Sequence, residues 1–158
     1  MSSNNLTSGE NQQERLNPYW LTGFTDGEGC FSISIIKNKT LKSGYQIFPE
    51  FVLTQGAKSL KTLEKVQNFF ECGKIYENKR YDNHRESLYK YCVRNKTDLV
   101  ERICPFFNKY PLQTAKQDDF KLFKQGLEII KNGEHLTNKG FFRIQEIASQ
   151  MNRKKPRV

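Results

Sequence analysis

Long apolar runs are missing from this sequence. Its uninterrupted apolar stretches are short, such as Phe51-Val52-Leu53, and its mean hydropathy is −0.76. A helix that spans a membrane needs about 18 or more apolar residues in succession. The polar segment 1–15 also lacks the apolar stretch of a secretory signal and the Arg-rich, acid-free composition of a transit peptide. We therefore predict no membrane partner.

Side chains that build zinc sites are few and dispersed. Six of them occur along the chain: Cys30, Cys72, Cys92, Cys104, His84 and His135. The cysteines form no close Cys-x-x-Cys pair of the kind that a zinc site normally uses, so we predict no structural zinc. Reduced thiols are the favoured interpretation, and they suit a reducing compartment.

Acidic residues are outnumbered by basic ones. The 158 residues include 26 Lys+Arg and 17 Asp+Glu, which gives a formal net charge of +9 and a pI of about 9.4. A chain this basic favours a polyanionic partner, for which the candidates are DNA, RNA or an acidic membrane surface. A basic protein without a nucleic-acid partner is the other interpretation, because net charge does not specify function.

The residue pattern predicts the order helix, hairpin, helix, hairpin and then further helices. The predicted helices run from Pro18 to Gly27 or Gly29, over 58–70, from Thr97 or Asp98 as the cap to about 107, and over 116–131 and 139–151. The predicted strands cover 30–36, 45–54, 74–80 and 87–94. Strands in hairpins give an antiparallel four-stranded sheet with helices on one face, an α+β class.

The domain organisation follows from composition and length. Residues 1–16 are rich in Ser, Asn, Gln and Glu and are predicted to be a flexible lead-in. Residues 153–158 form a basic C-terminal tail. Between them the chain has no low-complexity linker, so we predict one domain over residues 17–152.

Two glycines interrupt the first predicted helix. Gly23 and Gly27 are four residues apart, so they lie on one helix face and leave it without side chains. Each costs about 1 kcal/mol relative to Ala in a helix interior. Gly27 could simply help to end the helix, but Gly23 is then unexplained. A bare face permits the close approach of a second helix.

Two acids occupy the end of the same helix. Asp26 and Glu28 lie where the helix dipole is negative, so a cation must compensate them. Basic side chains could do so, and so could a divalent metal such as Mg²⁺ or Ca²⁺, which prefers oxygen ligands. If two copies of the helix pack through the glycine face, their acids converge on a site suited to phosphoryl chemistry.

The segment Leu21-Thr-Gly-Phe-Thr-Asp-Gly-Glu-Gly29 resembles the LAGLIDADG motif of homing endonucleases. The strand over 30–36 follows at once, as in that family, and the stretches 51–55 and 109–123 are also similar. The resemblance covers about residues 17–152 and implies an αββαββα module. Family members carry one motif and dimerise, or carry two motifs in a chain about twice as long. A homodimer is therefore implied. Its implied interface on the motif helix comprises Trp20, Gly23, Phe24 and Gly27.

The resemblance also implies roles in catalysis. Glu28 would bind catalytic Mg²⁺ with help from the carbonyl of Gly27, and Ca²⁺ would bind without supporting cleavage. Asp26 would serve the structure of the helix end, although a role in metal binding stays open. Gln55 would order water, and Lys116 would stabilise phosphate charge or activate water. A solvated surface charge is the alternative interpretation of Lys116.

The chain departs from the family at one basic position. A basic residue normally follows the second strand on the next helix, but the matching position here is Ser59. Lys58 and Lys61 are its neighbours, so the identity of this basic residue is left open among the three positions.

The sheet face turned away from the helices is predicted to read DNA in the major groove. By alternation it carries Ser32, Ser34, Ile36, Asn38, Gln46, Phe48, Glu50, Lys74, Tyr76, Asn78, Arg80 and Lys90. An ordinary hydrated face is the alternative, and a one-residue slip would exchange the two faces.

Three functions are compatible with the motif, the basic charge and the resemblance. The first is a metal-dependent endonuclease that cuts a long pseudo-palindromic DNA site, leaves short 3′ overhangs and spreads its intron. The second is an RNA maturase or cleavage-inactive DNA-binding protein of the same fold, which would bind intron RNA or DNA. The third, a structural dimer, leaves the basic sheet face unexplained. Retention of Glu28 favours cleavage. The composition is heavy in Lys, Asn, Ile, Phe and Tyr, residues whose codons are AT-rich, and together with the resemblance this suggests an organellar gene, in chloroplast or mitochondrion.

Overall fold

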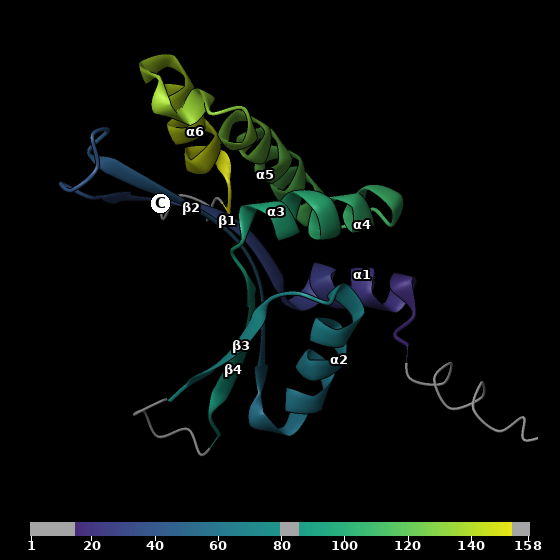
Figure 1. Ribbon diagram of the computed structural model, residues 1–158. Coiled ribbons are helices and arrows are strands. Elements are labelled where there is room, and N and C mark those ends of the chain that lie inside the picture. Colours follow the sequence, from purple (N-terminus) through teal and green to yellow (C-terminus); the bar gives the residue numbers. More distant parts are fainter. Residues whose placement is uncertain (1–14, 80–85, 153–158) are drawn as a thin grey trace, which may run out of the picture.

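The computed structural model describes residues 15–79 and 86–152 (Figure 1). Its elements are α1 (Pro18–Glu28), β1 (Gly29–Lys37), β2 (Tyr45–Gly56), η1 (Ala57–Ser59), α2 (Leu60–Phe70), β3 (Lys74–Asn78), β4 (Leu88–Val93), α3 (Lys96–Asp98), η2 (Leu99–Ile103), α4 (Cys104–Lys109), α5 (Lys116–Lys131), η3 (Glu134–Leu136) and α6 (Asn138–Gln150). The succession of helices and hairpins is as predicted. Arg80, the lead-in 1–14 and the tail 153–158 lie outside the described residues.

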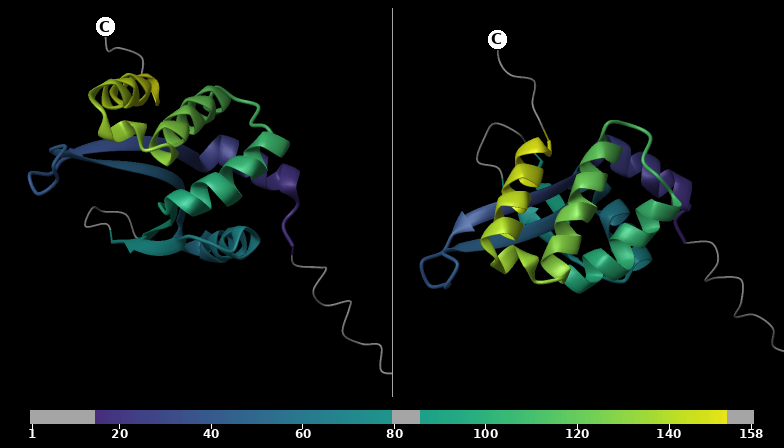
Figure 2. Two further views of the ribbon diagram at one scale, coloured as in Figure 1. Left: turned by 45° about the horizontal axis from the view of Figure 1, so that its top comes forward. Right: turned by 90° about the horizontal axis from the view of Figure 1, so that it is seen from above.

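The four strands form one antiparallel sheet in the order β1-β2-β4-β3. The helices lie on one side of this sheet, and the other side is open and concave between the β1–β2 and β3–β4 hairpins (Figure 1). The two further views show α5 and α6 side by side over β1 and β2 (Figure 2). The predicted α+β class, with helices on one face of a four-stranded antiparallel sheet, is confirmed.

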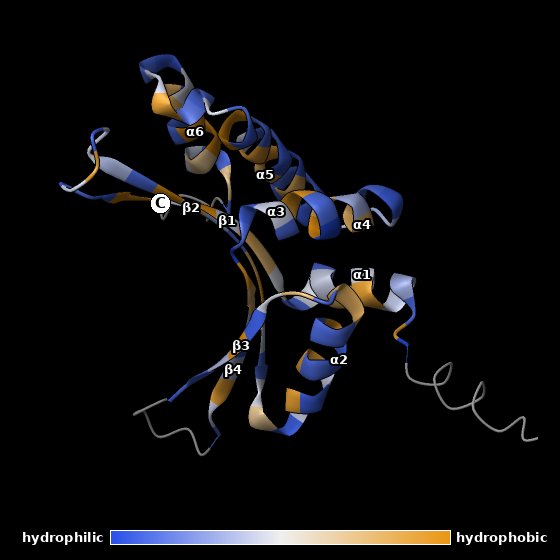
Figure 3. Ribbon diagram, in the orientation of Figure 1, coloured by the Kyte–Doolittle hydropathy of each residue, from blue (hydrophilic) through white to orange (hydrophobic). Residues whose placement is uncertain are grey.

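The core between sheet and helices is built on aromatic rings. The ring centroid of Phe31 lies 5.0 Å from that of Phe51, 5.4 Å from Phe107, 5.2 Å from Phe120 and 5.3 Å from Phe123. Hydrophobic residues alternate with hydrophilic ones along the strands and along the helices that cover them (Figure 3). The continuous core cluster extends from Leu21 to Met151. The predicted alternation of strands 30–36 and 45–54 is therefore in the correct register.

The N-cap residue was predicted correctly for the helix that begins at Pro18 but not for the one that begins at Lys96. Asn17 caps α1 as predicted, because its side-chain oxygen accepts from Tyr19 N at 2.8 Å and Trp20 N at 3.3 Å. The prediction that Thr97 or Asp98 caps the helix before 107 was wrong. Asn95 does so by accepting from Asp98 N at 3.1 Å, since Asn is as good a cap as Asp and stands just before the first helical residue.

No helix of residues 15–79 and 86–152 has the length and apolar character that a membrane crossing requires.

Candidate active site and nucleic-acid interface

One side of α1 is anchored in the core. Leu21, Thr22 and Thr25 are buried. The Thr22 hydroxyl donates to the carbonyl of Tyr110 at 3.0 Å, and the Thr25 hydroxyl donates to the carbonyl of Leu21 at 2.8 Å. Buried hydroxyls are stabilising when they are hydrogen-bonded in this way. The burial of these residues and the Thr22–Tyr110 bond fix which side of α1 faces the core, and so decide which residues of the motif face outward.

Asp26 joins the end of α1 to the segment before α5. Its carboxylate accepts from Gln113 N at 2.8 Å, from Thr114 N at 3.1 Å and from the Thr114 hydroxyl at 2.7 Å. Burial raises the pKa of Asp26, but the hydrogen bonds from Thr114 and Gln113 and the charge of Lys116 outweigh it, so the pKa lies below its ordinary value. The side chain of Asp26 is thus engaged in holding the helix end.

Lys116 supplies the positive charge at the same helix end. Its Nζ donates to the carbonyl oxygens of Thr25 at 3.0 Å and Asp26 at 2.9 Å. A cation at this position compensates the negative end of the helix dipole. Lys116 is half-buried and bonded, so its interpretation as a freely solvated charge was wrong. The ammonium lies on the carbonyls that precede Gly27 and Glu28 in the chain.

The predicted metal-binding residues stand at the exposed tip of this arrangement. Gly27 and Glu28 are exposed, and β1 starts immediately after them at Gly29. Gly29 is paired with Leu53 on β2. Gln55 therefore lies two residues beyond that pair, at the end of the sheet where α1 joins it. The register thus brings Gln55 to the same end of the sheet as the motif acids.

The three candidates for the missing basic position all follow β2 directly. Lys58 and Ser59 belong to η1 and Lys61 to the first turn of α2. Both lysines are exposed, whereas Ser59 is half-buried. The backbone N–H of Lys58 donates to the Glu86 carboxylate at 2.6 Å, which holds η1 against the start of β4. Both lysine side chains are thus placed near the end of β2 that carries Gln55.

The donor set at the tip of α1 fits a hard divalent cation. The Glu28 carboxylate and the carbonyl of Gly27 are oxygen ligands of the kind that Mg²⁺ and Ca²⁺ prefer. Among residues 15–79 and 86–152, His, Cys, Asp and Glu side chains form no group of three or more that could hold a metal ion.

The outward face of α1 has few contacts within the chain. Trp20, Gly23, Phe24 and Gly27 lie along it at helical spacing. The rings of Trp20 and Phe24 stack with centroids 4.9 Å apart, and Trp20 is 45% exposed. A Cβ atom added at Gly23 or Gly27 would meet nothing within 4 Å. Packing within this chain therefore does not require glycine at either position. An interface with another helix would give a reason for both glycines.

The open face of the sheet collects the residues that were predicted to read DNA. Pairing places Ser32 beside Glu50, Ser34 beside Phe48, Ile36 beside Gln46, and Tyr76 beside Lys90. Lys74 and Asn78 are exposed on the same strand as Tyr76, and Asn38 donates to the Gln46 side-chain oxygen at 3.2 Å. Ile36 is 52% exposed and adds an apolar side chain to this face.

Arg94 also lies on this face and was not among the predicted residues. Arg94 follows the last residue of β4, and continued alternation from Lys90 would have found it. Its guanidinium hydrogen-bonds to the Glu50 carboxylate, and this bond raises the pKa of Arg94. The other Glu50 oxygen lies 3.3 Å from the Lys90 Nζ. The guanidinium carbon also lies 5.7 Å from the centroid of the Tyr76 ring.

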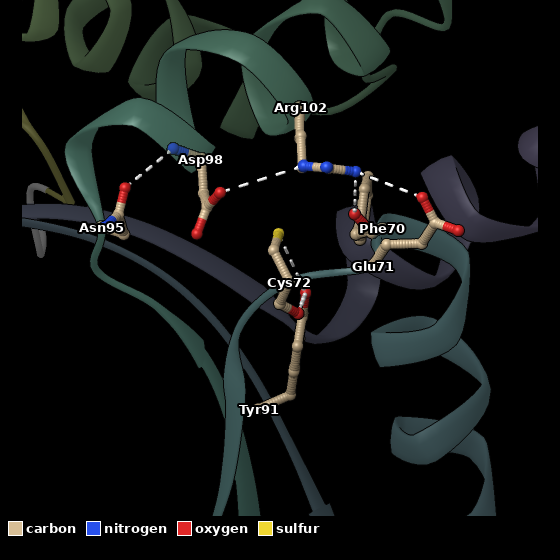
Figure 4. A network of polar contacts seen from close by, with 7 residues as sticks. All are labelled: Phe70, Glu71, Cys72, Tyr91, Asn95, Asp98 and Arg102. Atoms are coloured by element: carbon tan, nitrogen blue, oxygen red, sulfur yellow. Dashed lines mark hydrogen bonds and ion pairs between the residues drawn. The ribbon is translucent and has the colours of Figure 1, made fainter.

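A polar network fixes the β3–β4 hairpin to the helices (Figure 4). The Arg102 guanidinium donates to the carbonyl of Phe70 at 3.2 Å and to the Glu71 carboxylate at 3.3 Å. The Tyr91 hydroxyl donates to the carbonyl of Cys72 at 2.8 Å, and burial raises the pKa of Tyr91, so the phenol stays protonated. The network holds the end of α2 against η2 and the segment after α2 against strand β4.

The fold and the site together define a class of protein: an α+β module whose glycine-faced helix ends in an exposed acid beside an open sheet. The family model described as LAGLIDADG endonuclease matches residues 21–127. Because this match covers more than half of the chain, the protein belongs to the LAGLIDADG endonuclease family.

Relatives and solved structures agree with this assignment. A 50.9 kDa protein in ND4 intron 1 of Podospora anserina is 38% identical over 77% of this chain. Probable intron-encoded endonuclease 2 of Neurospora crassa is 31% identical over 84% of it. This chain spans 26% of the length of each of these two relatives.

Two solved structures share the fold. The homing endonuclease I-TnaI has 38% identity and a TM-score of 0.80, with 89% of this chain and 91% of that chain covered. I-SmaMI, bound to an uncleaved DNA target in the presence of calcium ions, has 36% identity and a TM-score of 0.80. This chain covers 45% of the I-SmaMI chain.

Proposed function

We propose that this chain is a site-specific homing endonuclease that acts as a homodimer. It would hydrolyse phosphodiester bonds in double-stranded DNA with divalent metal, leave short 3′ overhangs and promote the homing of its intron. One observation carries the proposal: the side of α1 with Gly23 and Gly27 is open, and the helix ends at the exposed Glu28, two residues after the Asp26 carbonyl that accepts from the Lys116 ammonium. We take residues 17–152 as the endonuclease domain.

The proposed dimer joins two copies of α1 through Trp20, Gly23, Phe24 and Gly27. Two glycines four residues apart let helix backbones approach closely. The lengths of the solved relatives support a two-module enzyme, because I-SmaMI has a chain about twice as long, whereas the I-TnaI chain is about as long as this one. The proposed interface places the two Glu28 side chains at one shared site.

The proposed cofactor is Mg²⁺, held by Glu28 and the Gly27 carbonyl. The calcium ions present with I-SmaMI and its uncleaved DNA support the use of a divalent metal, and we expect Ca²⁺ to bind here without supporting cleavage. When bound, Mg²⁺ would supply Lewis-acid activation of the phosphate and of the attacking water.

The remaining site residues have proposed roles of their own. Lys116 is already fixed on two carbonyls, so its charge is preorganised for the phosphate as well as for the helix end. Gln55 would orient water from the end of β2. Asp26 would act only through the position of α1, because three hydrogen bonds already occupy its carboxylate.

The proposed DNA target is long and pseudo-palindromic. A homodimer has two-fold symmetry, so it presents the same sheet face to two half-sites. The open face offers donors, acceptors and exposed apolar groups such as Ile36 and Tyr76 to base edges in the major groove. The intron-encoded relatives support an organellar gene as its source.

A cleavage selection from random duplexes tests the proposal. Purified protein is incubated with the duplex pool in Mg²⁺, in Ca²⁺ and in EDTA, and the cut ends are sequenced. We expect a long two-fold symmetric site cut in Mg²⁺ alone, with short 3′ overhangs. Sedimentation with and without the selected duplex measures the oligomeric state. A monomer on DNA, cutting in EDTA, or binding to intron RNA without cutting of any duplex would overturn the proposal.

A further inference from the structure

Three charged side chains form a cluster at the centre of the open sheet face. The Glu50 carboxylate lies 3.3 Å from the Lys90 Nζ through one oxygen and hydrogen-bonds to Arg94 through the other. The Glu50 side chain is 18% exposed, whereas those of Lys90 and Arg94 are 36% and 53% exposed. The acid is therefore at the base of the cluster, and the two cations are more open to a ligand.

The register explains how the cluster is formed. Glu50 is paired with Ser32 on β1, and on its other side it lies next to Arg94, one residue beyond the Phe51–Val93 pair. Lys90 is paired with Thr54, four residues along β2 from Glu50, so its side chain must extend along the sheet to reach the carboxylate.

Arg94 is held in a geometry that suits a base. The guanidinium binds Glu50 through Nε, which leaves both Nη groups as donors. The Tyr76 ring lies against the guanidinium, with its centroid 5.7 Å from the central carbon. A hollow of about 360 Å³, lined by Lys74, Tyr76, Arg94 and Asn95 among others, lies beside it. The open side of the cluster thus has room for a base edge.

We propose that Arg94 and Lys90 read a guanine-containing base pair in the major groove, and that Glu50 is a positioning residue that acts through Arg94. This inference rests on the proposed function, since it concerns the DNA target of the same protein. Arg and Lys are the side chains that most often bind the O6 and N7 acceptors of guanine. Both oxygens of Glu50 are engaged by the two cations, so direct acceptance from a cytosine amino group is not its role.

The place of the cluster predicts where this base pair lies. Ser32, beside Glu50, is four residues beyond Glu28 at the proposed cutting site. Four residues of strand span roughly 13 Å. At about 3.4 Å per base pair, this distance corresponds to about four base pairs. We therefore expect the pair to lie within about five base pairs of the cut in each half-site.

Cleavage-specificity profiles of four proteins test the proposal. The wild type, Arg94→Lys, Glu50→Gln and the double variant are each assayed on every single-base-pair variant of the target selected by the wild type. At one position near the cut, we expect the preference for guanine to fall about 10-fold in Arg94→Lys, because Lys cannot make the two-pronged contact; this equals about 1.4 kcal/mol. Glu50→Gln should reduce the same preference at the same position.

The double variant separates a positioning role from direct reading. If Glu50 acts through Arg94, the double variant has no less preference than Arg94→Lys alone. Losses that multiply, or a Glu50→Gln effect at a different base pair, would overturn the proposal. Arg143→Lys, at an exposed position of α6, is the matched control and should leave the profile unchanged.

Two kinds of failure are distinguishable in this experiment. If the wild type selects and cuts no duplex, the proposed function itself fails. If the wild type has a defined target and Arg94→Lys keeps the full profile, only the present inference fails. Thermal melting of each variant checks folding, and Arg94→Lys tests the reading residue by itself because it keeps the charge.

Discussion

On one side of α1, Thr22 and Asp26 are bonded to the segment 110–114, and the last carbonyls accept from Lys116. On the other side, a Cβ atom at Gly23 or Gly27 would meet nothing, and Trp20 is half exposed. The same eleven-residue helix is thus held by contacts within the chain on one side, while its other side is open at the two glycines.

The difference separates two requirements of the proposed shared active site. In the proposed homodimer the acids of the two subunits would have to meet at a defined distance, so each helix would need a fixed position within its own subunit. The partner helix must also approach closely, so the outer side has to lack side chains. Asp26 and Lys116 meet the first requirement, and the glycines meet the second. Glu28 is the last residue of α1, so its position depends on both features of the helix.

The largest expected effect is on the cutting rate, and it distinguishes Glu28 from Asp26. Glu28→Gln should lower the single-turnover cutting rate by about 1,000-fold, because it removes the charge proposed to hold metal beside the phosphate. Its melting temperature should stay at the wild-type value, since Glu28 is exposed. Asp26→Asn is the matched control and should cut within about 10-fold of the wild-type rate. Full activity of Glu28→Gln would refute the proposed site.

A side chain on the bare side tests the interface. Gly23→Leu should weaken dimerisation at least about 100-fold by blocking close helix approach. The isolated subunit should not lose stability, because the position is open and Leu is a better helix former than Gly by up to about 1 kcal/mol. Analytical ultracentrifugation and urea unfolding measure the two quantities. Intact dimers of Gly23→Leu would show that the subunits meet elsewhere.

Substitutions of Lys116 test the side of α1 that is bonded within the chain. Lys116→Met should lower the free energy of unfolding by about 2 kcal/mol, because two carbonyls lose a charged donor. Lys116→Arg, which keeps the charge, should recover most of that stability. Urea denaturation of the subunit measures both. Cutting rates at a temperature where all three proteins are folded then measure the effect on phosphate chemistry, and a Lys116→Met protein of unchanged stability would contradict the hydrogen bonds described here.

The smallest effect concerns pH. The pKa of Asp26 is lower in the folded chain than its ordinary value of 3.8, so its contribution is present above that value and is lost as the pH falls through the folded pKa. Asp26→Asn should therefore be less stable than the wild type by about 1 kcal/mol at pH 7. This gap should close at acid pH. Urea midpoints between pH 3 and pH 7 measure it, and a gap that does not vary with pH would exclude the ionised carboxylate as its cause.

Much of the fold was predictable because its periodic signals are local. The alternation of Phe31 and Ile33 and the helical pattern of 116–131 depend on neighbours in sequence, so they were read in the correct register. The cap at Asn95 was not predicted, because Thr97 and Asp98 are equally good candidates until the helix start is known. The ion pairs of Glu50 were also missed, since they join strands 40 or more residues apart in the sequence.

The sequence by itself determined the class of the chain, the glycine pattern of the motif helix and the order of its elements, because these depend on residue identity and local spacing. Only the tertiary structure decided that the Asp26 carboxylate accepts from the backbone of residues 113 and 114, that Lys116 binds carbonyls in the last turn of α1, and that Glu50 pairs with Lys90 and Arg94 on the open sheet face. Such contacts form between distant segments, and their partners are set by how the sheet and helices pack rather than by any local pattern.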